Sequence, residues 1–130
     1  MANEHVLLAP TNRTVDGPLF RSDKSNIVVE YDHQNEDGTV TWHRIVFVEV
    51  LAFEYRQASC CREDDFVGAN VIRCEHTSPT LETVVSRWRE SVGWQEWHLK
   101  HGGADRFKRF SMFFDDAACI HVIASKYQVE

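Results

Sequence analysis

The C-terminal segment, residues 107–129, constrains the fold of this chain more than any other part of the sequence. It reads FKRFSMFFDDAACIHVIASKYQV, with two strongly apolar stretches on either side of Asp115-Asp116, which is typical of a β-hairpin. A loop of three residues places Phe114 opposite Ala118. It also aligns a continuous apolar face made of Phe110, Met112, Phe114, Ala118, Ile120, Val122 and Ala124. A loop of two or four residues would instead set this face against Cys119 and His121, so the sequence predicts the three-residue loop.

One α-helix is clearly indicated, over about residues 79–92. Ser78 is a good N-cap, and Pro79 loses no hydrogen bond at the first helical position. Gly93 ends or kinks the helix. A single apolar stripe follows the helical period and consists of Leu81, Val84, Val85, Trp88 and Val92. We expect this stripe to be buried against apolar side chains of the sheet, namely Phe47, Leu51, Phe53, Phe110, Met112, Ile120 and Val122.

Two strand-like segments precede the helix and are joined by the turn residues 35–38. The first, residues 27–33, alternates in polarity, and the second, residues 39–56, is longer than a single strand usually is. We therefore expect a bulge or break near residues 43–45. A four-residue loop would place Val40 and Trp42 on the same apolar face as Val29 and Tyr31. A further strand is predicted within residues 66–75.

The order of these elements predicts an α+β fold. We expect a single domain with a mostly antiparallel sheet of about five strands, one main helix packed on it and a C-terminal hairpin. This domain covers residues 27–130. Residues 1–26 show little periodicity and are predicted to be a loosely structured lead-in, with one short strand near Val6–Leu8.

Length and charge exclude several functional classes. A chain of 130 residues suits one domain, and its net charge of −6 argues against a nucleic-acid partner while it is compatible with a basic protein partner. No apolar run approaches the roughly 20 residues of a membrane helix. The N-terminus has neither the basic region nor the apolar region of a signal peptide. We therefore expect a cytoplasmic protein whose four cysteines are reduced thiols.

The candidate metal-binding and catalytic residues lack a recognised arrangement. The possible ligand pairs are Cys60 with Cys61, Cys74 with His76, and His98 with His101, and none has the spacing of a structural or catalytic zinc site. Cys119 and His121 share a strand face, which sets them side by side without orienting one onto the other. A Gly-rich phosphate loop is also absent. The sequence therefore predicts no catalytic residue, no cofactor and no metal.

Acidic groups and tryptophans are the remaining candidates for function. Acidic pairs and runs fall at predicted loop tips, where they are either solvated turn carboxylates or an acidic recognition surface. Trp88 belongs to the apolar stripe of the helix and is predicted to be in the core. Trp94 and Trp97 follow Gly93, and exposed aromatic side chains are enriched in interfaces. The predicted partner-binding residues are Glu63, Asp64, Asp65, Trp94, Trp97, Asp115 and Asp116.

Four segments carry a resemblance to a known group of proteins. They read IVFVEVLAFEYR, TSPTLETVVSRW, LKHGGADRFKRFSMFFDD and ACIHVIASKY, and together they span about residues 45–127. They resemble a loose group of small bacterial proteins, several of which are immunity proteins of polymorphic toxin systems. The resemblance implies a cytoplasmic protein without enzymatic activity that binds and blocks a cognate toxin, such as a basic toxin domain.

A different reading of the same sequence is a small enzyme or ligand-binding protein. Its pocket would lie between the sheet and the helix, with His98, His101 or His121 as the polar group. Trp94 and Trp97 would form an aromatic wall of this pocket. A deep pocket that contains two or more of these residues would favour this alternative.

Overall fold

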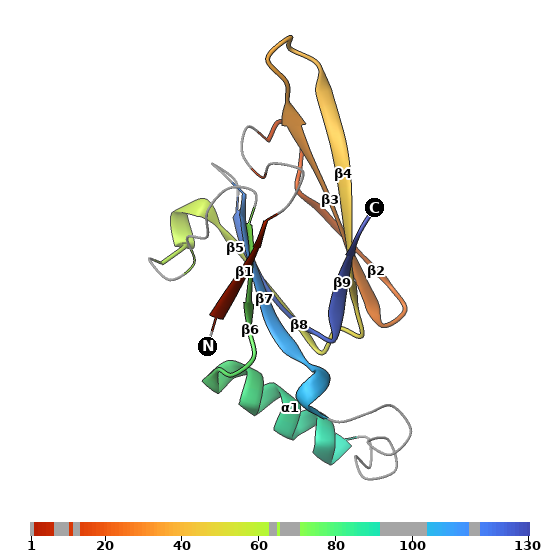
Figure 1. Ribbon diagram of the computed structural model, residues 1–130, viewed down its shortest axis with the longest axis vertical. Coiled ribbons are helices and arrows are strands. Elements are labelled where there is room, and N and C mark those ends of the chain that lie inside the picture. Colours follow the sequence, from red (N-terminus) through yellow and green to blue (C-terminus); the bar gives the residue numbers. More distant parts are fainter. Residues whose placement is uncertain are drawn as a thin grey trace.

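Two antiparallel sheets packed face to face, with one helix outside them, form the described part of the chain (Figure 1). The computed structural model describes residues 2–6, 11, 14–62, 65, 71–91, 104–114 and 118–130. The five-stranded sheet contains, in spatial order, β1 (Ala2–Val6), β6 (Val71–Glu75), β7 (Lys108–Phe114), β8 (Ala118–Ala124) and β5 (Ala52–Gln57). The four-stranded sheet contains β2 (Leu19–Asp23), β3 (Asn26–Gln34), β4 (Val40–Val48) and β9 (Lys126–Val129). These sheets and the helix α1 (Pro79–Ser91) confirm the predicted α+β class.

The main core lies between the two sheets. Tyr31 and Phe47 come from the four-stranded sheet, and their rings lie 5.4 Å from Phe114 and 5.8 Å from Phe110 respectively, measured between centroids. Burial raises the pKa of Tyr31 to about 12. The fully buried residues of this core are Val29, Tyr31, Ile45, Phe47, Ile72, Cys74, Phe110, Met112, Phe114, Ile120, Val122 and Ala124.

The C-terminal hairpin has the predicted register. Phe114 pairs with Ala118, Met112 with Ile120, and Phe110 with Val122. The apolar face expected from the sequence is the face that meets the four-stranded sheet. Residues 115–117 lie outside the described residues, but the pairs on either side confirm the odd-length connection.

The helix begins where the sequence predicts. The hydroxyl of Ser78 accepts a hydrogen bond of 3.0 Å from the backbone N–H of Leu81, which is the geometry of an N-cap. Leu81, Val85 and Trp88 are buried, as expected of the apolar stripe. Trp88 packs edge-to-face on Phe107, with ring centroids 5.0 Å apart.

The predicted partners of this helical stripe are wrong, apart from Leu51. The stripe packs on Phe107, Ile123, Leu51 and Ala52, on the outer face of the five-stranded sheet. Phe47, Phe53, Phe110, Met112, Ile120 and Val122 pack in the core between the sheets instead. Every residue of β8 is buried, because this central strand has a second sheet on one face and, at its C-terminal end, the helix on the other.

The β3–β4 hairpin differs from its predicted register by one residue. Tyr31 pairs with His43, and Val29 pairs with Ile45. The loop between the strands spans residues 35–39 and is closed by a hydrogen bond of 2.7 Å from the N–H of Asn35 to the carbonyl of Thr39. Because the slip exchanges the two faces, Val40 and Trp42 lie exposed rather than on the core face.

The expected break in the long strand also occurs at a different place. Strand β4 continues through residues 43–45 and ends at Val48, and β5 begins at Ala52. Between them Glu49 has a φ of 54°, and the chain crosses from one sheet to the other. Backbone hydrogen bonds from Val50 to Ser25 and from Leu51 to Ile123 fix this crossing.

Residues 1–26 contain more regular structure than the predicted loose lead-in. Strand β1 pairs with β6, and β2 pairs with β3, so both sheets gain a strand from this segment. Only Val6 of the strand expected near Val6–Leu8 lies in the described residues. The carboxylate of the buried Asp32 accepts backbone hydrogen bonds from residues 15–17 at 2.8–3.2 Å. These bonds outweigh the effect of burial and lower the pKa of Asp32.

No helix among the described residues has the length and apolar character needed to cross a membrane.

Candidate functional site

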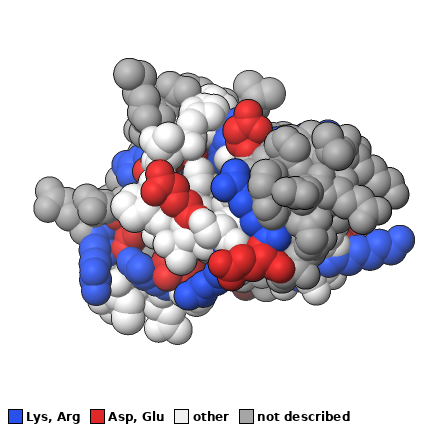
Figure 2. All heavy atoms as spheres, turned by 90° about the horizontal axis from the view of Figure 1, so that it is seen from below, with Lys and Arg blue, Asp and Glu red and all other residues white. Residues whose placement is uncertain are grey.

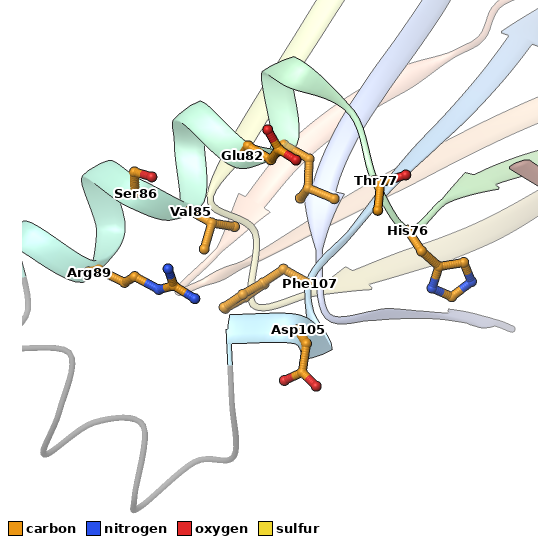
Figure 3. A pocket seen from close by; sticks show the side chains of 9 residues that line it. His76, Thr77, Glu82, Val85, Ser86, Arg89, Asp105 and Phe107 are labelled. Carbon is orange, nitrogen blue, oxygen red and sulfur yellow. The ribbon is translucent and has the colours of Figure 1, made fainter. Parts of the chain in front are cut away.

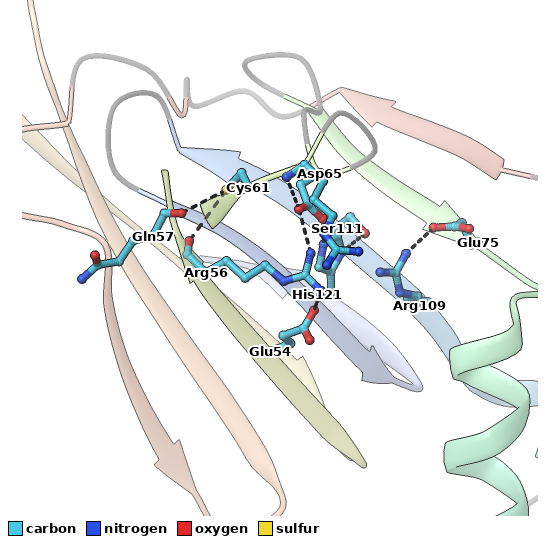
Figure 4. A network of polar contacts seen from close by, with 10 residues as sticks. Glu54, Arg56, Gln57, Cys61, Asp65, Glu75, Arg109, Ser111 and His121 are labelled. Carbon is cyan, nitrogen blue, oxygen red and sulfur yellow. Dashed lines mark hydrogen bonds and ion pairs between the residues drawn. The ribbon is translucent and has the colours of Figure 1, made fainter. Parts of the chain in front are cut away.

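A buried chain of polar side chains lies on the outer face of the five-stranded sheet (Figure 4). Ser111 of β7 and His121 of β8 are cross-strand partners, and the Ser111 hydroxyl lies 2.7 Å from His121 Nδ1. His121 Nε2 lies 2.5 Å from Asp65 Oδ1. Arg56 Nη1 of β5 donates to Asp65 Oδ2 at 2.9 Å. We call these four residues the buried polar chain.

The alternation of the strands explains why these polar groups meet. Ser111 and His121 occupy the positions between the apolar core residues of their strands, so they point away from the other sheet. Asp65 is positioned by the backbone N–H of Arg62, which donates to Oδ2 at 2.7 Å. Ser111, Asp65 and His121 are 0%, 3% and 5% exposed. Each of the three buried polar groups therefore has a partner, as buried polar groups require.

The protonation of the buried polar chain follows from its contacts. Burial alone would raise the pKa of Asp65, but hydrogen bonds from the Arg62 backbone, His121 and Arg56 outweigh it and lower this pKa to about 2. Burial lowers the pKa of His121, against the opposing effect of Asp65. At neutral pH His121 is therefore a neutral imidazole. Its Nε2–H donates to Asp65, and its Nδ1 accepts the hydroxyl hydrogen of Ser111.

Serine, histidine and aspartate are also the residues of a hydrolase triad, but this arrangement does not support that chemistry. In such triads the serine contacts Nε2 and the carboxylate contacts Nδ1, whereas the two nitrogens are exchanged here. The Ser111 side chain is also fully buried, so no substrate carbonyl reaches its oxygen in this structure. The buried polar chain therefore joins β5, β7, β8 and the segment around Asp65 without presenting a nucleophile.

A cavity of about 350 Å³ lies beside the buried polar chain, between the sheet and the start of α1. Its walls include Arg56, Thr80, Arg109 and His121. Arg109 Nη1 forms an ion pair of 2.8 Å with Glu75, but its Nε is buried and has no hydrogen-bond partner among the described residues. Of the residues named for the sheet–helix pocket of the alternative interpretation, His121 lines this cavity, and His98, His101, Trp94 and Trp97 lie outside the described residues.

A second cavity of about 410 Å³ lies along α1 (Figure 3). Val85 and Phe107 line its apolar part, and Glu82, Arg89 and Asp105 bring charges of both signs to it. Figure 2 shows a similar mixture of basic and acidic side chains over the described surface of that view, without an extended area of one sign. Such a mixture does not select a strongly charged ligand.

Two thiols and a carboxylate come together next to the buried polar chain. The ligand atoms of Cys61, Asp65 and Cys119 all lie within 4.8 Å of one another. Cys119 is buried and Cys61 half-buried. Burial, the hydrogen bond with Cys61 and the charge of Asp65 raise the pKa of Cys119 to about 12. We call these three residues the thiol cluster.

Sequence reasoning missed the thiol cluster because its members are distant in the chain. The β5–β8 register pairs Arg56 with Cys119 and so brings residue 119 close to the turn that follows β5. Among the described residues, none of the ligand pairs considered from sequence spacing contributes both of its members to the thiol cluster. Cys74 Sγ lies 4.0 Å from His76 Nε2, Cys60 is exposed, and His98 and His101 lie outside the described residues.

The outer face of the four-stranded sheet carries an exposed tryptophan. Trp42 is 45% exposed and lies on β4 two positions from Arg44, on the same strand face. Glu30 of β3 forms ion pairs of 3.4 Å with both Arg21 and Arg44. Together with Glu130 and His43, Glu30, Trp42 and Arg44 line a hollow of about 250 Å³. The sequence had placed Trp42 on the same apolar face as Val29 and Tyr31 and did not predict this surface.

The predicted partner-binding residues are distributed unevenly over the described structure. Asp65 is buried, and its carboxylate contacts groups of the same chain rather than solvent. The remaining predicted residues lie outside the described part of the chain, and they are Glu63, Asp64, Trp94, Trp97, Asp115 and Asp116.

Comparisons with protein-family models, with curated proteins and with solved structures find no match to this chain.

Proposed function

We propose that this chain is a non-catalytic protein-binding domain that contacts its partner through the outer face of the four-stranded sheet around Trp42. The exposure of Trp42 carries this proposal. Tryptophan and arginine are enriched among the residues that dominate binding energy, and Trp42 lies beside Arg44 on one strand face. The buried Ser111 hydroxyl supports a non-catalytic role.

The surface around Trp42 is held in place before any partner binds. It lies on regular strands, and Glu30 connects Arg21 of β2 with Arg44 of β4 across the sheet. The strands beneath it are anchored by Ile45 and Phe47 in the core. A preorganised surface loses little conformational entropy on association, which favours affinity.

The partner we propose is a basic toxin domain that this chain blocks by stoichiometric association, as an immunity protein does. The resemblance of residues 45–127 to immunity proteins supports this class of partner. The net charge of −6 also supports it, because opposite net charges accelerate encounter between proteins.

Affinity purification from the native host tests the proposal. The tagged wild type is compared with Trp42→Ala and with a matched control, Tyr55→Ala, which removes an equally exposed aromatic ring from edge strand β5 of the other sheet. We expect one stoichiometric protein partner with the wild type and the control, and its loss with Trp42→Ala. Expression of that partner alone should be toxic, and co-expression of this chain should relieve the toxicity. Recovery of no stoichiometric partner, or equal recovery with all three proteins, would contradict the proposal.

A second candidate function is the binding of a small carboxylate in the sheet–helix cavity. Arg109 favours it, because its guanidinium lines the cavity and its Nε has no hydrogen-bond partner among the described residues. Arg109→Lys tests this role, since it keeps the positive charge near Glu75 but removes the Nε donor. Amide shifts that a panel of small carboxylates induces around Thr80 and Ile123 in the wild type, and that this variant abolishes, would support it. Their absence in the wild type would exclude it.

A further inference from the structure

We propose that Cys61, Asp65 and Cys119 bind one thiophilic divalent metal ion of the Zn²⁺ class. Thiolate sulfur and carboxylate oxygen are both zinc ligands, and two thiols converge with a carboxylate at this position. The site is separate from the surface around Trp42, so it does not depend on the proposed function.

The separations within the thiol cluster suit such an ion after a small adjustment. Zinc binds sulfur at about 2.3 Å and carboxylate oxygen at about 2.0–2.2 Å, so tetrahedral ligands lie about 3.5–3.8 Å apart. The three ligand atoms already lie within 4.8 Å of one another. An approach of about 1.3 Å or less therefore completes the arrangement.

Cys61 is the ligand that can make this adjustment. Cys119 is fixed in the central strand β8, and Asp65 is fixed by Arg56, His121 and the Arg62 backbone. Cys61 is half-buried, and its thiol has weak partners among the described residues, namely the carbonyls of Gln57 at 3.4 Å and Arg56 at 3.9 Å and the thiol of Cys119. Thiols are weak donors, so these bonds are exchanged for a metal bond at little cost.

The carboxylate of Asp65 has a lone pair available to bind a metal ion. Its Oδ2 accepts from both Arg56 and the Arg62 backbone, while its Oδ1 accepts only from His121 among the described residues. A carboxylate oxygen has two lone pairs, so Oδ1 has one left to donate to an ion. Contacts of this kind orient metal ligands in many sites, which gives the buried polar chain a positioning role.

The net charge of the site stays the same when an ion binds. Without metal the carboxylate of Asp65 is balanced by the guanidinium of Arg56. A divalent ion brings two positive charges, and the two thiols each lose one proton to solvent as their sulfurs bind. A buried site with unchanged net charge avoids the large desolvation cost of an isolated charge. Three protein ligands leave the fourth tetrahedral position to a water molecule, which approaches beside the half-buried Cys61.

Titration of the reduced, metal-free chain with Co²⁺ tests the site. We expect one equivalent to bind with a thiolate-to-cobalt charge-transfer band, and one equivalent of Zn²⁺ to displace it. Cys61→Ser and Cys119→Ala should each weaken binding by more than about 100-fold, because even changes behind the ligands cost about 10–100-fold. Two matched controls replace cysteines outside the thiol cluster. Cys60→Ser changes an exposed thiol next to the cluster, and Cys74→Ser changes a buried thiol close to His76. Both controls should bind Co²⁺ as the wild type does.

A measurement on the wild type alone covers the case in which a buried-cysteine variant fails to fold. The ¹¹³Cd chemical shift of the cadmium-loaded protein reports the number of sulfur ligands, and we expect two. No charge-transfer band in the reduced wild type, a band that survives both cluster variants, or a cadmium shift without sulfur ligands would overturn the proposal. So would a reduced chain that binds no metal but forms a Cys61–Cys119 disulfide when treated with glutathione disulfide.

Discussion

His121 Nε2 lies 2.5 Å from Asp65 Oδ1, and this buried contact joins the central strand β8 to a residue 56 positions earlier in the chain. It connects the two parts of the site, because the buried polar chain extends from His121 and the thiol cluster shares Asp65. Asp65 is therefore the residue on which most of the interior polar structure depends.

Replacing Asp65 should strongly destabilise the protein. Asp65→Ala removes the acceptor of the buried His121 and of the Arg62 backbone, and each buried donor left without a partner costs about 1–3 kcal/mol. It also removes the ion-pair partner of the half-buried Arg56. The control is Glu54→Ala, which removes the exposed partner of the same Arg56 and should change stability by less than about 1 kcal/mol. Urea unfolding of metal-free protein measures both. Equal effects of the two variants would show that Asp65 does not stabilise the interior.

Acid should destabilise the wild type through the same carboxylate. The pKa of Asp65 is lowered from 3.8 to about 2, so its contribution is fully present above the ordinary value and is lost as the pH falls from 3.8 through 2. The shift corresponds to about 2 kcal/mol. Urea unfolding at several pH values between 6 and 2.5 should show a steeper loss for the wild type than for Asp65→Asn. Parallel profiles for the two proteins would contradict the assigned pKa.

The helix should depend on Trp88 for its attachment to the sheet. Trp88 is buried, packs edge-to-face on Phe107 and has the Arg106 guanidinium 5.3 Å from its ring centroid. Trp88→Ala should therefore cost about 3–5 kcal/mol, as large-to-small changes of buried aromatic residues do. The exposed neighbour Arg87→Ala should stay within about 0.5 kcal/mol of the wild type. A loss below about 1 kcal/mol for Trp88→Ala would mean that the stripe is not held against the sheet.

Local signals predicted the parts of the fold that depend on neighbouring residues. The apolar alternation of residues 107–129 determined the hairpin register, and Ser78 with Pro79 determined the start of the helix. The second sheet was not predictable in this way. The apolar face of the hairpin can be covered by either a helix or another sheet. The alternation of apolar residues does not indicate which of the two covers it.

The candidate site was less predictable than the fold, for a related reason. Its residues come from β5, the turn after it, β7 and β8, and they meet only through long-range strand pairing. The polar residues that alternate with the apolar residues of β7 and β8 were the one available signal. The predicted register already makes Ser111 and His121 cross-strand partners. Trp42 was misplaced because a loop longer by one residue moves every side chain of its strand to the other face.

Calorimetric titration of the purified partner into this chain is the most direct test of binding through Trp42. We expect Trp42→Ala to weaken the association by at least about 2 kcal/mol, or about 30-fold, as is typical of a residue that dominates an interface. Tyr55→Ala, which removes a ring with the same exposed fraction of 45%, should bind as the wild type does. A Trp42→Ala variant that remains folded and binds with unchanged affinity would contradict the central claim.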